Sequence, residues 1–201
     1  MALSSMDGKN SRLSLTIRDI TLIALLAVIL FVQEEALTFV PGLQFTVFLL
    51  VFYSKKLGLW RTSVIVLVHV FLDNLFIGSF SLIYTPFMFL GWIIIPITMC
   101  TLFRRVENPF ILGLLGALYS FLYCWMFFIP DCAIYGIGLI PKFLSDILFE
   151  ALMAAMSFLS LVLLYKPLSK ILDPILDSYF RRSGFKQEME RQEKNDNIDS
   201  K

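Results

Sequence analysis

The chain has 201 residues, of which 58% are hydrophobic and only 16% are charged. Soluble domains carry about 25% charged residues, so this composition excludes an ordinary soluble domain and favours a single membrane-embedded one. The net charge of +1 says little about partners, because in membrane proteins the position of the charges carries the information. The first apolar run is followed directly by Gln33, Glu34 and Glu35 and not by a small-residue cleavage site, so we expect a retained helix.

Six hydrophobic runs have the composition of membrane-spanning helices, which need about 20 mostly apolar residues. Pro41 and Gly42 precede the second run, which is short, and they predict a bent entry into the membrane. Backbone polar groups in lipid must be bonded within the chain, so we predict an all-α membrane protein, a compact bundle of six transmembrane helices. In chain order the runs cover residues 16–32, 43–54, 62–77, 87–103, 110–129 and 143–165.

The segment after the sixth run has a different character. Apolar residues recur at helical spacing between Leu168 and Tyr179, which predicts a C-terminal interfacial helix on the inner surface or a helix packed on the bundle's cytoplasmic end. From about Gln187 the chain is polar and lacks aromatic residues, so we expect disorder. The predicted organisation is an N-terminal tail (1–15), a transmembrane domain (16–166), and an amphipathic helix with a disordered tail (167–201).

The basic residues indicate the orientation of the chain. All Lys and Arg residues except Lys142 fall in segments that the alternation of hydrophobic runs assigns to one side of the membrane. Cytoplasmic segments carry the excess of Lys and Arg, so we predict a multi-pass protein of the cell membrane with both termini in the cytoplasm. Lys142 lies at the outer end of the sixth run.

Ionisable residues inside the predicted spans cluster near their outer ends. Each costs at least a few kcal/mol to place in lipid, which makes such groups functional candidates. Lys142, Asp146 and Glu150 follow one another at four-residue steps, so they form one stripe on the sixth helix. This stripe either faces a ligand or holds helices together, with Lys142 and Asp146 as an ion pair and Glu150 protonated or bonded to a hydroxyl.

A second group of polar residues lies on the first and third runs. His69 and Asp73 share a helix face, and Asn74 is adjacent to Asp73. Glu34 and Glu35 at the outer end of the first helix would close the same outward-facing cavity, or they are solvated loop charges. A lone histidine in an apolar bundle is more often an interhelical hydrogen bonder than a ligand, so His69 is left out of the predicted site.

Aromatic residues form a further group near the outer ends of the predicted helices. Two interpretations are open: their rings stack on a flat heterocyclic ligand, or they belong to the aromatic belt of the membrane interface. Trp92 is the least typical of a belt, because it lies several residues inside its helix. The predicted substrate-binding residues are Glu34, Glu35, Asp73, Asn74, Tyr84, Trp92, Trp125, Lys142, Asp146 and Glu150.

The sequence motifs of soluble enzymes are missing. The chain has no phosphate-cradling glycine loop, no Walker-type lysine and no Cys or His ligand cluster, so we expect no enzyme activity, no cofactor and no metal. Glu34 and Glu35 with His69-x-x-x-Asp73 are similar to the intramembrane CAAX-type metalloproteases. That family needs two separate histidine motifs and usually an Arg four residues after the second Glu, whereas this chain has one histidine and Phe39 at that position.

The whole layout resembles the substrate-binding S component of energy-coupling factor (ECF) vitamin transporters. Six short hydrophobic helices, a Pro-containing outer loop after the first, and cytoplasmic termini carry the resemblance, which covers about residues 17–167. Its strongest stretch is Phe-Val-Pro-Gly-Leu-Gln-Phe-Thr-Val at 39–47. Leu-Asp-Asn at 72–74 and Pro-Phe-Met-Phe-Leu-Gly-Trp at 86–92 add to it.

The resemblance implies a role in uptake. ECF S components bind a vitamin in a cavity of the outer half and then dock on a transmembrane coupling subunit driven by two ATPase subunits, which use the ATP. The implied partners are those subunits, a small water-soluble vitamin or precursor, and the lipid bilayer, with no nucleic acid. Because acids outnumber bases among the candidate residues, an amine-bearing ligand is favoured.

The resemblance also implies a docking face on the first helix, where the family usually carries an Ala-x-x-x-Ala-like motif that permits close approach. Ala24 and Ala27 are three residues apart and Val28 occupies the i+4 position, so the strict motif is not met. The leading alternative is a non-transporting membrane scaffold, since MreD-type cell-shape proteins are similar in size and helix count.

Overall fold

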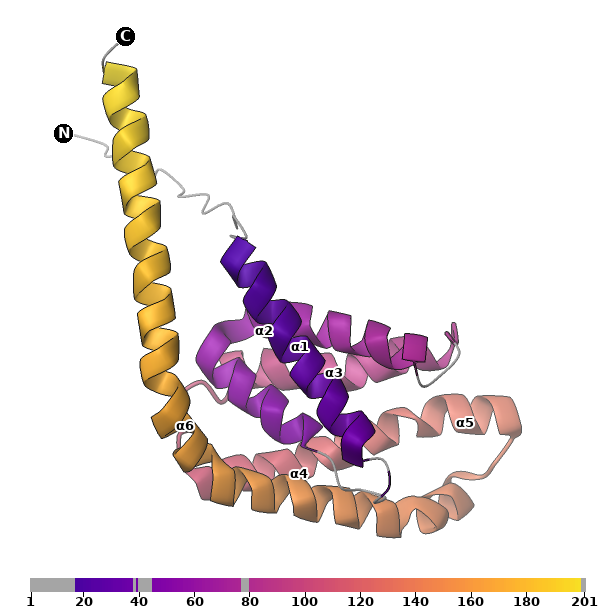
Figure 1. Ribbon diagram of the computed structural model, residues 1–201. Coiled ribbons are helices and arrows are strands. Elements are labelled where there is room, and N and C mark those ends of the chain that lie inside the picture. Colours follow the sequence, from indigo (N-terminus) through magenta and orange to yellow (C-terminus); the bar gives the residue numbers. More distant parts are fainter. Residues whose placement is uncertain (1–16, 38, 40–44, 77–79, 200–201) are drawn as a thin grey trace, which may run out of the picture.

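The computed structural model describes residues 17–37, 39, 45–76 and 80–199; the side chains of Arg18 and residues 180–199 are outside the description. The expected N-terminal tail and the bent entry at Pro41 and Gly42 also lie outside the described residues. All regular structure in the described ranges is helical (Figure 1). The helices are α1 (Ile17–Leu37), α2 (Thr46–Phe76), α3 (Tyr84–Thr101), α4 (Pro109–Met126), α5 (Phe128–Tyr135) and α6 (Leu139–Asp199).

The helical segments have the make-up of a multi-pass membrane protein. Leu67, Leu148 and Leu163 are 57%, 72% and 64% exposed, as expected where lipid covers the outer surface of a bundle. Within the described ranges, five segments are long and apolar enough to cross a membrane: Asp19–Leu37, Thr46–Phe76, Tyr84–Thr101, Pro109–Tyr135 and Leu139–Tyr179.

The second and third predicted spans form the two halves of α2. Gly58 interrupts this helix with φ 81° and ψ 178°, a backbone conformation that essentially only glycine adopts. The ribbon turns back at this break, so the two halves of α2 make a sharp bend within the bundle (Figure 1). The described residues thus give five spanning segments by length and composition, and a six-crossing topology stays a prediction.

Small residues allow α4 and α6 to pack closely. A Cβ atom on Gly113 would lie 2.9 Å from Phe158 Cδ2, so a larger residue would push the helices apart. The hydroxyl oxygens of Ser120 and Ser157 are 2.7 Å apart and hydrogen-bonded across the same interface. Close backbone approach with interhelical hydroxyl bonds is the usual way that helices associate in lipid.

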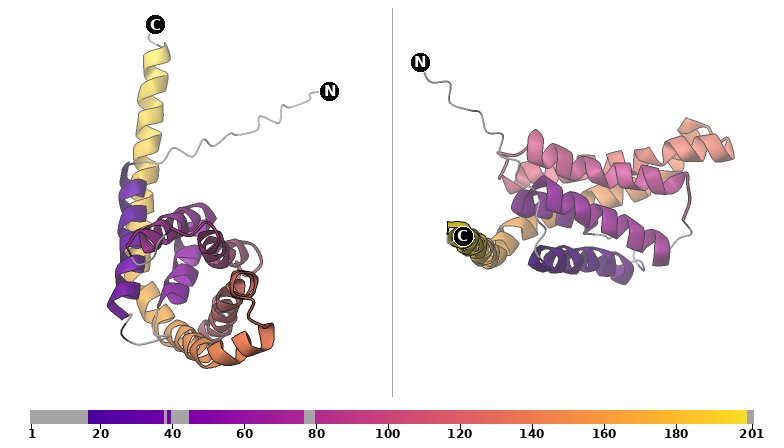
Figure 2. Two further views of the ribbon diagram at one scale, coloured as in Figure 1. Left: turned by 90° about the vertical axis from the view of Figure 1, so that its right-hand side faces the viewer. Right: turned by 90° about the horizontal axis from the view of Figure 1, so that it is seen from above.

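The predicted sixth span and the segment that follows it belong to one helix. α6 continues through Pro167 and Pro174 and bends in this region, as proline inside a helix causes (Figures 1 and 2). Three leucines of this part, Leu168, Leu172 and Leu176, pack against the hydrophobic core, which favours packing on the bundle over a separate interfacial helix. The last part of α6 extends away from the bundle (Figure 1). It is helical as far as Asp199, whereas the sequence predicts disorder from about Gln187 onward.

Contacts at one end of the bundle bring the predicted cytoplasmic segments together. These contacts join α1, α2 and α6 and connect α2 to the end of α3. We call this the basic end, because Lys55, Lys56 and Arg61 make the contacts. Lys55 Nζ donates hydrogen bonds to the carbonyl oxygens of Phe103 (2.6 Å) and Arg104 (3.1 Å). Two ion pairs join Lys56 to Asp173 (2.7 Å) and Arg61 to Asp19 (3.1 Å).

The opposite end collects most of the predicted site, and we call it the acidic end. Along α1, Glu34 lies about 22 Å from Asp19, because each helical residue adds about 1.5 Å. Its charged residues are Glu34, Glu35, Asp73, Asp131, Lys142, Asp146 and Glu150.

Candidate functional site at the acidic end

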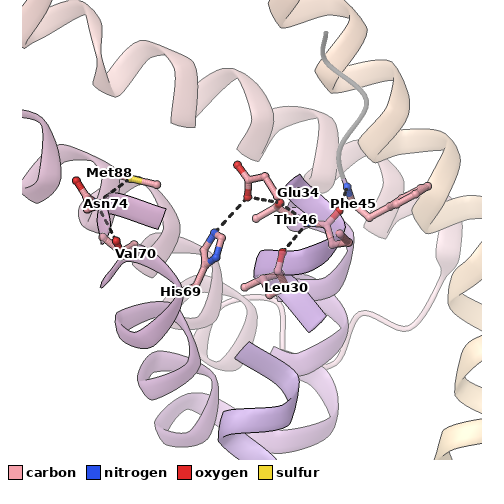
Figure 3. A network of polar contacts seen from close by, with 9 residues as sticks. Leu30, Glu34, Phe45, Thr46, His69, Val70, Asn74 and Met88 are labelled. Atoms are coloured by element: carbon pink, nitrogen blue, oxygen red, sulfur yellow. Dashed lines mark hydrogen bonds and ion pairs between the residues drawn. The ribbon is translucent and has the colours of Figure 1, made fainter. Parts of the chain in front are cut away.

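A hydrogen-bonded network ties the end of α1 to both halves of α2. Glu34 Oε2 lies 3.3 Å from His69 Nε2 and accepts a hydrogen bond from Thr46 Oγ1 at 3.0 Å (Figure 3). Gln33 Nε2 donates to Thr46 Oγ1 at 2.8 Å, and Gln33 Oε1 accepts from the Phe45 backbone N–H at 2.9 Å. This last bond satisfies a donor at the start of α2 that the helix itself leaves unpaired. Glu34 is therefore held in place at the site.

Among the described residues, several buried polar atoms near this network have no hydrogen-bond partner, and they include atoms of two α2 side chains. His69 is fully buried, and its Nδ1 has no hydrogen-bond partner among the described residues. The same holds for Asp73 Oδ1, one helical turn further along α2. An unsatisfied buried polar group costs about 1–3 kcal/mol, so native proteins rarely keep one without a purpose.

An aromatic stack borders the same region. Trp92 of α3 is fully buried and stacks on Tyr123 of α4, with ring centroids 3.7 Å apart and planes inclined by 19°. Gly91 makes this possible, because a Cβ atom there would lie 2.7 Å from Tyr123 Cδ2. Trp92 is thus packed in the interior and is not part of an interfacial belt.

The aromatic contacts continue from this stack towards α5. Tyr123 meets Phe127 edge-on at 5.1 Å, and Phe127 stacks on Tyr84 at 6.2 Å. At the other end of the row, the Trp92 ring lies 6.4 Å from His69. The row therefore links the Glu34–His69 network to the polar residues on α5 and α6.

Lys142 is held between two carboxylates. Its Nζ lies 2.8 Å from Asp131 Oδ2 on α5 and 2.7 Å from Asp146 Oδ2 on its own helix. Tyr84 OH donates to Asp131 Oδ1 at 2.6 Å, and Ser145 Oγ donates to Asp146 Oδ1 at 2.9 Å. The ion-pair interpretation of Lys142 and Asp146 is therefore the one that the structure supports.

Glu150 differs from the other two residues of its stripe. It is fully buried, and its Oε2 accepts a hydrogen bond from Trp125 Nε1 at 3.2 Å. No described residue bonds its Oε1, which is also buried. Of the three stripe residues, Glu150 alone thus combines complete burial with a carboxylate oxygen that no described residue bonds.

Several of the predicted site residues bond other parts of the protein or are exposed. Asn74 Nδ2 donates to Val70 O at 2.7 Å and its Oδ1 accepts from Thr85 Oγ1 at 2.7 Å, so its amide joins α2 to α3. Both ends of its amide thus have a protein partner, and the binding of a ligand by Asn74 stays a prediction. Glu35 is exposed, and Trp125, 45% exposed, contacts the site through Glu150.

The predicted docking pair does not share one surface. Ala27 is fully buried and lies on the same face of α1 as Ile23 and Leu30, which both belong to the core. Ala24 is exposed. Residues three apart are offset around a helix, so Ala27 faces the core and only Ala24 is exposed to a partner; docking through α1 stays a prediction.

Some residues of the site are not evident from the sequence. Asp131 lies in a stretch predicted to be an outer loop, and the pairing that makes it important joins residues far apart in the chain. Gln33 and Thr46 look like ordinary polar residues at helix ends. An acid within an otherwise apolar stretch is the signal that would have identified Asp131; the other two give none.

No family model matches the chain, and no curated protein and no solved structure is significantly similar to it. In the described part of the chain, no three His, Cys, Asp or Glu side chains come together in a way that would hold a metal ion. The chemistry of the site therefore follows from its own groups: acidic oxygens, one histidine, one lysine and a row of aromatic rings. Such a set favours a cationic or amine-bearing ligand with a flat ring.

Proposed function

We propose that this protein binds a small, water-soluble, amine-bearing molecule at its acidic end and is the substrate-binding subunit of an ECF-type uptake transporter. The observation that carries the proposal is the presence there of buried polar atoms without partners among the described residues, His69 Nδ1, Asp73 Oδ1 and Glu150 Oε1. Ionisable groups inside a membrane span are costly and mark functional sites by default.

The charges of the acidic end favour a cation. Asp131 and Asp146 share Lys142, and Glu34 Oε2 contacts His69 Nε2 at 3.3 Å. Asp73 and Glu150 have no cation within ion-pair distance in the described part of the chain. A ligand amine would supply the missing positive charge, and the Trp92–Tyr123 stack would provide an apolar wall for a heterocycle.

A transport role explains the separation of the two ends. With the basic end in the cytoplasm, the acidic end faces the outside, where a substrate would arrive. The protein itself then needs no ATP site or cofactor, because the ATPases and the coupling subunit that the ECF resemblance implies would supply the energy. The exposed apolar side of α1, with Ile20, Ala24 and Val28, is the surface that we propose for docking.

A membrane scaffold of the MreD type is the second candidate. One observation favours it: α6 extends beyond the bundle as a helix as far as Asp199, which offers a partner a long surface. A scaffold has no use for unpartnered acids in its interior. Ligand binding at Asp73 and Glu150 therefore separates the two functions.

The direct test is thermal unfolding of the purified protein in a detergent of fixed lipid content. A panel of water-soluble vitamins, their precursors and nucleobases is added one at a time. We expect at least one amine-bearing member to raise the midpoint by several degrees, as mass action requires of a ligand present well above its Kd. If every member of the panel leaves the midpoint unchanged, the transport proposal fails.

A further inference from the structure

A cavity of about 480 Å³ lies at the bend of α2, at the basic end and far from the acidic site. Its volume falls within the range of about 300–1,000 Å³ that is typical of small-ligand sites. We call it the α2-bend cavity. Its lining includes four cationic residues and no acidic residue; the cations are Lys55, Lys56, Arg61 and Arg104.

The cations of the α2-bend cavity are only partly compensated. Lys56 pairs with Asp173 and Arg61 with Asp19, and neither carboxylate lines the cavity. Lys55 bonds backbone carbonyl oxygens at the end of α3, which carry no net charge. Two of the four positive charges thus have no carboxylate in ion-pair contact within the described residues, so the cavity attracts an anion.

The break in α2 adds to this attraction. The second half of the helix starts after Gly58, which lines the cavity together with Leu59. The first N–H groups of a helix have no partner within it, and the start of a helix carries a partial positive charge that favours phosphate groups. Four cations, a partly open cavity and a helix start therefore converge on one place.

The surroundings of the cavity distinguish a lipid from a free ion. Leu59 lines the cavity and is 41% exposed, and Trp60 beside it is 49% exposed, so apolar surface adjoins the basic lining. Anionic phospholipids present a phosphate at the depth of the membrane interface, and basic pockets between helices on the cytoplasmic side bind such head groups. We propose that the α2-bend cavity binds the phosphate of an anionic phospholipid from the leaflet around the basic end.

Arg104 allows a test that leaves the fold in place. Its side chain is exposed and makes no ion pair within the described residues, so Arg104→Gln should fold. Arg105→Gln is the matched control, because Arg105 is also exposed and adjacent but does not line the cavity. Purified wild type and both variants are each given phosphatidylglycerol, phosphatidylcholine or inorganic phosphate, and the bound molecules are counted by native mass spectrometry.

We expect wild type and Arg105→Gln to retain one phosphatidylglycerol and little phosphatidylcholine. Loss of one charge-assisted phosphate contact should weaken this retention about tenfold in Arg104→Gln. Equal losses in the two variants would mean a diffuse basic surface and overturn the proposal. The proposal would also be overturned if inorganic phosphate displaced the lipid at a concentration equal to that of the lipid, because the site would then select a free anion. Neither result depends on what the acidic end binds.

Discussion

The two ends of the bundle use charge in different ways. At the basic end, Lys56 and Arg61 form ion pairs with carboxylates at 2.7 and 3.1 Å. Lys55 donates hydrogen bonds to the carbonyl oxygens that follow α3. At the acidic end, Asp73 and Glu150 keep buried oxygens that no described residue bonds. The contacts of the basic end therefore hold helices together, whereas the acidic end contains buried polar groups without partners among the described residues, which lowers stability.

This difference indicates which charges matter for function. Charges in ion pairs near the membrane surface contribute little to stability, often less than about 1 kcal/mol, and they mainly orient the chain. Buried groups without partners lower stability and persist where another molecule uses them. Variants at the two ends should therefore separate binding from stability.

The largest effect is expected from the double variant Asp73→Asn and Glu150→Gln. Each change keeps the size of the side chain and removes its negative charge, so affinity for a cationic ligand should fall at least about 100-fold. The fold should persist, since neither carboxylate makes an ion pair within the described residues. Isothermal titration with the ligand found in the panel provides the measurement.

The matched control for this variant is Asp177→Asn with Glu107→Gln, which makes the same chemical changes at exposed positions of the basic end. Its affinity should equal that of the wild type. If the two double variants bind alike, charge at the acidic end has no role in recognition.

The next effect concerns the backbone at the bend of α2. Gly58→Ala places a side chain at φ 81°, ψ 178° and should lower the free energy of unfolding by about 1–3 kcal/mol. Gly136→Ala, at φ 63° after α5, should cost only about 1 kcal/mol, because a left-handed helical conformation is less strained. A Cβ atom at either site would meet open space, so crowding does not confuse the comparison. Chemical denaturation of both variants should rank them in this order, and a reversed ranking would contradict the assignment of strain to the bend.

Lys142→Gln should have a moderate effect at the acidic end. It removes the cation that Asp131 and Asp146 share, while the three side chains are between 14% and 30% exposed, so solvent screens part of the loss. We expect a decrease of about 1–2 kcal/mol in the free energy of unfolding. The same denaturation experiment measures it, and unchanged stability would show that the pairing holds no helices together.

The smallest effect is expected from Lys56→Gln at the basic end. Its partner Asp173 is 45% exposed, so the pair should contribute less than about 1 kcal/mol. A loss larger than that of Lys142→Gln would invert the contrast between the two ends.

The sequence predicts the helical class and the separation of charge, because both follow from patterns along the chain. Runs of apolar residues predict the apolar helices, although the second and third runs form one bent helix. The positions of Lys and Arg anticipate that Lys55, Arg61 and Lys56 gather at one end. Four-residue spacing offers the Lys142–Asp146 ion pair as one of two interpretations of the stripe, and the structure contains that pair. These features depend on local periodicity, which a sequence displays directly.

The rest of the site depends on contacts between distant residues. Glu34 with His69, and Asp131 with Lys142, join residues on different helices, and no spacing rule specifies such pairs. The same reason applies to Asn74, whose partner Thr85 lies on the next helix. A single sequence shows which groups are costly to bury but not which of them find partners.

Native mass spectrometry of the protein purified from its own host, with wild type and the Asp73→Asn, Glu150→Gln double variant side by side, tests the binding of a cation at the acidic end most directly. We expect one small molecule per wild-type protein, carrying an amine that is positively charged at neutral pH, and none on the double variant. A polyanion as the bound molecule, or equal occupancy of both proteins, would contradict the proposed site.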